Sequence, residues 1–451
     1  MGSAGNAALT AARRRLLLRR QLATTPGRLR LAATMIALAA IAFGIVAAHA
    51  ADTRRQAVRD VATNGGLLVK SVDLSARLSD AHAIAASSFL AGGPEPGRAH
   101  LAYDDELRVA SDRLAELAGE IERSSRGGRA VGVITRRLPE YSSLVASARA
   151  NYRLGHPIGA AYLRAASATL RDAPGGMLPS ARTLYEIQAT KLTASYHDGV
   201  STATLLAVLL AGCVLLVVLA ATQAYLTRAT RRLVNVRLAL ATTLTVGLVA
   251  WMTVAFALQR GDLVQAQRSG SDPVELLTAA RILASRAQAN ESIALSARGS
   301  GEGEPNLADV DRGFLAVVTP VRGLLEQARS GADATSDATA SRVAVATIVR
   351  AYARYRAAHD RVVGAQRDGD FTQAVRLAVQ SRLGEPSTKD TAERLNSALD
   401  QGIAIAQEDF ARRAADALSA LDGLAPAIAL LTVLAALLAL SGVRERLEEY
   451  R

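Results

Sequence analysis

Four apolar runs divide the chain into alternating apolar and polar stretches. They cover residues 31–49, 204–225, 238–258 and 424–443, and none of them contains Asp, Glu, Lys or Arg. Each is close to the ~20 residues that a helix needs to cross ~30 Å of hydrocarbon. The pattern therefore predicts four transmembrane helices.

Two long polar segments lie between these runs, and their apolar residues recur at intervals of three and four positions. The first segment has one series from Leu107 to Ile121 and another from Val131 to Tyr152. The second segment has series from Val310 to Ala328 and from Val345 to Val362. This spacing is typical of helices that pack nearly parallel in bundles, and we find no alternating strand pattern.

Breakers rich in Gly and Pro divide each polar segment into about four long helices and a short fifth. Examples are GGPEPG (92–97) in the first segment and LGEPS (383–387) in the second. The stretches LSDAHAIAASSFLAGGPEPG (78–97) and LASRAQANESIALSARGSGEGEP (283–305) also resemble each other faintly. A tandem repeat of one unit is therefore a hypothesis that depends mainly on the repeated layout.

The distribution of charge orients the predicted spans. The formal net charge is +12, of which residues 1–30 contribute +7 and residues 226–237 contribute +4. Arginines beside a span tend to remain in the cytoplasm. The topology-determining residues of the short loop are Arg228, Arg231, Arg232 and Arg237. They predict a cytoplasmic hairpin, with both termini cytoplasmic and both polar segments outside the cell membrane.

The predicted fold class is an all-α multi-pass membrane protein, built from two tandem units of transmembrane helix, extracytoplasmic helical bundle and transmembrane helix. The predicted parts are a basic cytoplasmic tail (1–30), transmembrane helix 1 (31–49), extracytoplasmic bundle 1 (50–203), transmembrane helix 2 (204–225), the cytoplasmic basic hairpin (226–237), transmembrane helix 3 (238–258), extracytoplasmic bundle 2 (259–423), transmembrane helix 4 (424–443) and a cytoplasmic tail (444–451).

The basic composition and the first apolar run each allow another interpretation. A sequence pI near 10.3 is compatible with nucleic-acid binding, but the two polar segments are nearly neutral, so we expect no nucleic-acid partner. The stretch AAHAAD (Ala47 to Asp52) resembles a signal-peptidase site. The long basic leader and long apolar run favour an uncleaved anchor, and either outcome places the first polar segment outside.

The sequence contains no good candidate for catalysis. Its six histidines are scattered without a His-x-x-x-His pair, and it has no Gly-rich phosphate loop followed by Lys. We therefore expect no enzyme activity, cofactor or metal. His359 lies at a helical seam position, which favours a packed, hydrogen-bonded histidine over a pH sensor. The acidic run Asp104 to Glu106 fits a solvated helix face better than a metal site.

The most distinctive stretch is LPEYSSLVASARANYRLGHPIGAAYLRAAS (138–167), with LPSARTLYE (178–186) downstream. Together with the span layout, it resembles the GlnX-like family of four-span membrane proteins from high-GC Gram-positive bacteria. That resemblance implies amino-acid sensing with two partners: an extracytoplasmic amino-acid-binding lipoprotein, GlnH, and a cytoplasmic Ser/Thr kinase, PknG. The bundles are also similar to the four-helix sensor domains of chemoreceptors and histidine kinases.

Residues 149–167 are also a candidate ligand or partner contact. Arg149 and Arg153 are four positions apart on one helix face, and Asn151, Tyr162 and Arg164 are near in sequence. Guanidinium groups suit carboxylates through paired hydrogen bonds. The alternative is that these residues cap helix ends and pair with acids of their own domain.

We therefore expect a non-enzymatic membrane signal transducer. It would receive an extracytoplasmic ligand or amino-acid-binding lipoprotein and relay its state to a cytoplasmic partner such as a Ser/Thr kinase. The alternatives are a cell-envelope scaffold that does not signal and an accessory subunit of a transporter. The sequence leaves the ligand, the partner and the oligomeric state open.

Overall fold

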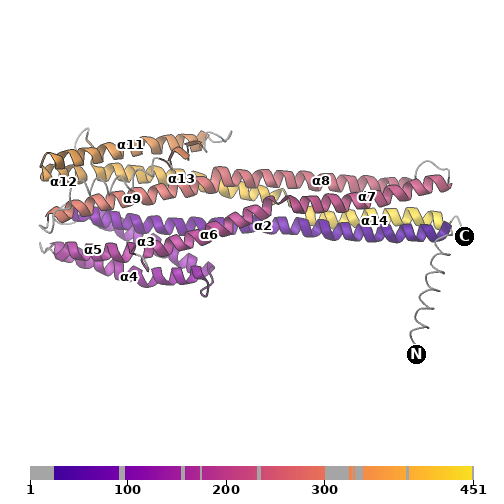
Figure 1. Cartoon of the computed structure of the whole chain (residues 1–451), viewed down its shortest axis with the longest axis horizontal. Coiled ribbons are helices and arrows are strands. Elements are labelled where there is room, and N and C mark those ends of the chain that lie inside the picture. Colours follow the sequence, from indigo (N-terminus) through magenta and orange to yellow (C-terminus); the bar gives the residue numbers. More distant parts are fainter. Residues whose placement is uncertain are drawn as a thin grey trace, which may run out of the picture. The chain divides into compact units, whose positions relative to one another are not determined.

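In the computed structural model, the described residues form helices joined by short turns (Figure 1). Those residues are 25–90, 97–153, 158–172, 175–230, 235–299, 323, 325–327, 329–330, 339–381 and 385–448. The helices are α2 (Thr25–Leu90), α3 (Gly97–Glu120), α4 (Arg126–Arg153), α5 (Ile158–Arg171), α6 (Met177–Val200), α7 (Thr202–Thr230), α8 (Val236–Ala266), η1 (Gln267–Ser271), α9 (Asp272–Gly299), α11 (Thr339–Arg367), α12 (Phe371–Val379), α13 (Thr388–Ser419) and α14 (Leu424–Glu448).

The predicted breakers coincide with helix ends. Helix α2 ends just before GGPEPG, and α12 ends before LGEPS. The first polar segment contains long helices and the short helix α5, as its periodicity predicted. Much of the series predicted from Val310 to Ala328 lies outside the described residues.

Four stretches of the described chain are long and apolar enough to cross a membrane. They lie within Gly27–Leu90, Met177–Arg228, Val236–Leu295 and Thr388–Glu445, and each contains one of the predicted apolar runs. The described part of the chain is therefore all-helical in outline, with the four candidate membrane-spanning helices of a multi-pass membrane protein.

The chain forms two compact units, the first of which we call the span unit. It comprises residues 1–59, 196–263 and 415–451, and thus the four apolar runs. Small residues bring its helices close together. A Cβ added at Gly212 of α7 would lie 2.7 Å from Val249 and 3.4 Å from Phe43, while one at Gly44 of α2 would lie 3.2 Å from Thr432 of α14. Such close packing is typical of helices in membranes.

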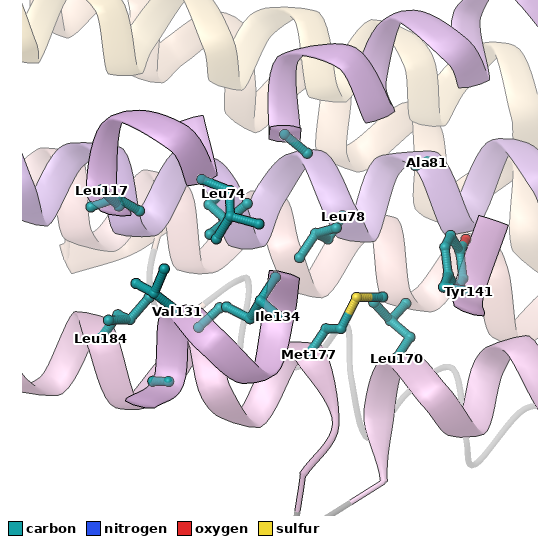
Figure 2. Close-up of a cluster of buried hydrophobic side chains, with 14 of the residues drawn as sticks. Leu74, Leu78, Ala81, Leu117, Val131, Ile134, Tyr141, Leu170, Met177 and Leu184 are labelled. Carbon is teal, nitrogen blue, oxygen red and sulfur yellow. The ribbon is translucent and has the colours of Figure 1, made fainter. Parts of the chain in front are cut away.

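The second compact unit, the polar unit, comprises residues 60–195 and 264–414. In its first half, α2, α3, α4, α5 and α6 enclose a core that includes Leu74, Leu78, Tyr141 and Leu170 (Figure 2). In its second half, α9, α11 and α13 enclose another core around Tyr355 and Leu399. The predicted seam positions of α3, α4 and α11 supply much of both cores.

The two halves of the polar unit also pack against each other. Ala83 and Ala86 of α2 form a small buried cluster with Ala289 of α9. These residues belong to the two stretches whose sequences resemble each other. Their small side chains allow the two helix backbones to approach, and this approach positions the polar groups described below.

One large side chain packs against two glycines of the polar unit. Phe410 of α13 lies beside Gly65 of α2 and beside Gly270 of η1. A Cβ added at Gly270 would lie 2.6 Å from the Phe410 Cβ and 2.8 Å from its Cα, so that the α13 backbone itself would have to move. The π-helical turn at 267–271 and the ring of Phe410 therefore depend on a residue without a side chain.

We expect Gly270→Ala to lower the stability of the polar unit by about 1–3 kcal/mol, the usual cost of overpacking a core. Thermal unfolding of the purified full chain in nanodiscs measures this. The control is Gly66→Ala, because nothing lies within 4 Å of the Cβ added there and alanine favours a helix. Equal melting temperatures for the two variants would contradict the packing argument.

Candidate functional site

A buried carboxylate on α2 is the centre of a polar network that joins the two halves of the polar unit. Asp80 is 6% exposed, and its Oδ2 lies 2.7 Å from Nη2 of Arg281 on α9. The hydroxyl of Ser285, one turn further along α9, donates a hydrogen bond to the other carboxylate oxygen, Oδ1. Asp80 therefore holds α9 at two points that are four residues apart.

Arg281 also reaches a third helix. Its side chain is 4% exposed, and Nη1 lies 2.6 Å from Oδ1 of Asp400 on α13. Asn396, one turn before Asp400, donates a hydrogen bond of 3.1 Å to the Ser285 hydroxyl. One guanidinium group thus bridges two carboxylates on two different helices, an arrangement for which its planar fork of donors is suited.

The network continues along α2 towards α3. Arg77 donates to both carboxylate oxygens of Glu106, at 3.3 and 3.1 Å, and to Asp73 one turn away, at 3.2 Å. Asp73 in turn accepts a hydrogen bond of 2.9 Å from Arg113. The charges of Arg77 and Glu106 also interact with that of Asp80, so the charged groups of α3, α2, α9 and α13 form one electrostatic cluster.

Burial governs the ionisation of these acids. Burial raises the pKa of the Asp80 carboxyl, while Arg281 opposes the increase. Burial also raises the pKa of Glu106, and the nearby charge of Asp80 adds to this effect. Burial likewise raises the pKa of Asp400, and the charge of Arg281 again opposes the increase. Each acid is therefore sensitive to movement of its arginine partner, because the guanidinium group is what favours the ionised form.

Other polar pairs line the same helices. Nδ1 of His359 on α11 pairs with a carboxylate oxygen of Glu291 on α9, and the histidine is fully buried. Arg171 of α5 donates a hydrogen bond of 2.7 Å to Asn290 of α9. Helix α9 is therefore held by polar contacts from both halves of the unit. His359 is the packed, hydrogen-bonded histidine that the sequence favoured.

A second buried histidine, His82, lies on α2 two residues beyond Asp80. Its Nδ1 is 3.3 Å from the hydroxyl of Tyr141 on α4. Burial lowers the pKa of His82 to about 3, and the charge of Arg171 contributes. The imidazole is therefore neutral in the folded protein near neutral pH.

The structure places the residues of the predicted contact site in different surroundings. Arg149 is 9% exposed, and its guanidinium group lies over the ring of Tyr103, 4.2 Å from the centroid. Asn151 donates a hydrogen bond of 2.8 Å to the Ser147 carbonyl of its own helix. Arg149 is thus buried against an aromatic ring inside the bundle, a contact that neither the partner-contact interpretation nor its alternative of helix capping and acid pairing named.

The remaining contact candidates lie on α5 or at the end of α4. Tyr162 of α5 is half-buried and packs against a cluster that contains Phe89 and Leu163. Arg164 is exposed. Arg153 is the last residue of α4, and its side chain lies outside the described part of the chain. A partner contact through these five residues stays a prediction, with Arg164 as its accessible member.

The arginines predicted to set the topology are only partly described. Arg228 is exposed near the end of α7, and Arg237 lies 3.4 Å from Glu445 of α14. Arg231 and Arg232 lie outside the described residues.

Sequence reasoning missed the network because its pairs are distant in sequence. Asp80 lies within the first of the two similar stretches and Arg281 two residues before the second, each on an alanine-rich helix, and this was the available signal. The prediction of a solvated helix face at residues 104–106 is correct for two of the three acids. Asp104 and Asp105 are exposed as expected, whereas Glu106 faces inwards and pairs with Arg77.

Comparison with known proteins gives one match. Residues 35–197 match the family model of the actinobacterial sensor domain. The matched range covers most of the first apolar run and most of the first polar segment. No curated protein and no solved structure matches the chain. The chain therefore contains an actinobacterial sensor domain in a protein with four candidate transmembrane helices.

The histidine beside the network predicts a pH dependence of stability. The pKa of His82 falls from an ordinary value of 6.5 to about 3 in the folded chain. The unfolded chain therefore takes up a proton between these values while the folded chain does not. Stability is lost as the pH falls below 6.5, by about 2 kcal/mol at pH 5 from this group alone.

We expect His82→Gln to reduce this loss. Unfolding free energies of the wild type and the variant at pH 7 and pH 5 measure it. Between these two pH values, the wild type should lose about 2 kcal/mol more unfolding free energy than the variant. His100, an exposed histidine on α3, provides the control His100→Gln. A parallel pH response in all three proteins would refute the assignment.

Proposed function

We propose that the protein is a membrane signal transducer. Its polar unit receives an extracytoplasmic input, from a small ligand or from an amino-acid-binding lipoprotein, and the transmembrane helices relay the state of that unit to a cytoplasmic partner such as a Ser/Thr kinase. The observation that carries this proposal is the match of residues 35–197 to the actinobacterial sensor domain.

The continuity of α2 supports a relay. This single helix extends from Thr25 to Leu90, so it includes both the first apolar run and Asp80. A helix without a break transmits displacement along its length, and small helix shifts are a known way to pass a signal. Asp80 is therefore positioned on an element that also enters the membrane.

The charged network supports a response with discrete states. Arg281 lies between Asp80 and Asp400, and a shift of α9 would break at least one of these ion pairs. Separating the buried Asp80–Arg281 pair costs about 3–5 kcal/mol, whereas the pair with Asp400, whose side chain is 40% exposed, contributes less. Intermediate positions are therefore disfavoured, and a new position of α9 requires a new set of pairings.

The main alternative is a cell-envelope scaffold that assembles other proteins without signalling, and an accessory subunit of a transporter is the next. A scaffold keeps its partners whatever the supply of amino acids. A transducer changes its contacts with that supply. The two can therefore be distinguished by one experiment in cells.

We expect cross-linking of an affinity-tagged copy in intact cells, followed by mass spectrometry, to recover an extracytoplasmic solute-binding lipoprotein. Its yield should change when aspartate or glutamate is added. Arg164→Ala should lower that yield severalfold if the exposed guanidinium group meets carboxylates of the partner. Arg182→Ala, at an exposed arginine of α6, is the control. Recovery of only cell-wall or division proteins, unchanged by amino acids, would favour the scaffold.

The proposed topology places both polar segments outside and both termini inside. In a Cys213→Ser background, we expect a membrane-impermeant maleimide to label Ala102→Cys of α3 and Ala353→Cys of α11 in intact cells. Val236→Cys, beside the proposed cytoplasmic hairpin, should react only after the cells are permeabilised. All three positions are exposed within the folded chain. Labelling of Val236→Cys in intact cells would contradict the proposed orientation.

A further inference from the structure

A buried arginine of the span unit lies where one helix ends and the next begins. Helices α6 and α7 are separated by a single non-helical residue, Ser201, whereas α2 passes through the same unit without a break. Arg54 of α2 is 2% exposed and donates to the Ser201 carbonyl at 2.7 Å and to the Gly199 carbonyl at 3.5 Å. Carbonyls at the end of a helix lack partners within that helix, and Arg54 supplies them.

The same guanidinium group contacts two further elements. Nε donates a hydrogen bond of 2.9 Å to Thr204 in the first turn of α7, and Nη1 donates one of 2.7 Å to Gln259 of α8. Gln259 is fully buried and donates to the Gly199 carbonyl as well, at 3.1 Å. The guanidinium group also lies 4.3 Å from the ring centroid of Phe256, a cation–π contact.

We propose that Arg54 is the positioning residue that couples α2 to the second membrane span. It connects the unbroken helix to both sides of the α6–α7 break, so a displacement of α2 moves the start of α7 with it. The inference deepens the proposed function, because it assigns the step that passes a change in α2 to another transmembrane helix.

The neighbouring arginine provides a matched control. Arg55 pairs with Asp422 in the turn between α13 and α14, at 2.5 Å, and both side chains are substantially exposed. Exposed ion pairs contribute about 0–1 kcal/mol. Arg55→Ala therefore removes the same charge from the next position of α2 without touching the α6–α7 break.

The test measures coupling rather than stability. Spin labels at Arg30→Cys of α2 and Ala224→Cys of α7, in a Cys213→Ser background, report the distance between these two helices in the full chain in nanodiscs. Both positions are exposed. Asp80→Asn, in the polar network, serves as the perturbation, since it weakens the pairing with Arg281 and requires no known ligand.

We expect Asp80→Asn to shift the distance distribution when Arg54 is present. Arg54→Lys should abolish that shift, because an ammonium group lacks the planar fork that reaches several acceptors. Gln259→Leu should reduce it, and Arg55→Ala should leave it unchanged. The Gln259 variant keeps the test decisive if Arg54→Lys fails to fold.

Two results would overturn the inference: a shift of undiminished size in Arg54→Lys or Gln259→Leu, and no shift in the presence of Arg54. Neither depends on an amino acid or a protein partner. Failure of the coupling is therefore distinguishable from failure of the partner-capture experiment, and each proposal can stand or fall separately.

Discussion

The structure of the polar unit depends on how Arg281 is buried. A guanidinium group that is withdrawn from water loses hydration worth several kcal/mol, and only well-placed acceptors offset this loss. Asp80 and Asp400 provide them from two different helices. The positions of α2, α9 and α13 are thereby linked, because none of the three can slide along another without separating a buried charge from its partner.

The apolar contacts between the same helices would not impose such a requirement. Ala83, Ala86 and Ala289 pack closely, but alanine faces are smooth and nearly repetitive, so many registers bury similar areas. The buried charges distinguish one register from its neighbours. We infer that they fix the register more than they add net stability, since buried ion pairs often stabilise a fold no more than apolar side chains of similar size.

The sequence predicted those features that local pattern determines. Apolar runs without charges gave the four spans, and the interval of three and four positions gave the buried faces of α3, α4 and α11. Pairings between residues far apart in sequence could not be predicted from one chain. Asp80 and Arg281 are separated by 201 positions, and no local rule brings them together.

Local sequence pattern is equally insufficient to place the residues of the candidate contact site. Arg149 and Arg153 are four positions apart on α4, but spacing alone does not say which way a helix face points. Tyr103, on another helix, occupies the position over the Arg149 guanidinium group. Arg164, by contrast, is exposed, and its accessibility also depends on how α5 packs rather than on its neighbours in sequence.

The unbroken course of α2 has a consequence for how this chain can vary in length. Each residue of an α-helix turns the chain by about 100°, so one residue inserted between Phe43 and Asp80 would rotate one of these side chains away from its neighbours. No non-helical residue in α2 absorbs such a change. On the returning helices, Ser201 separates α6 from α7, and the turn at Gly423, where φ is +74°, precedes α14. Insertions and deletions should therefore be selected against along α2 and also at Ser201, whose carbonyl accepts from Arg54, whereas the turn at Gly423 is the junction that tolerates them.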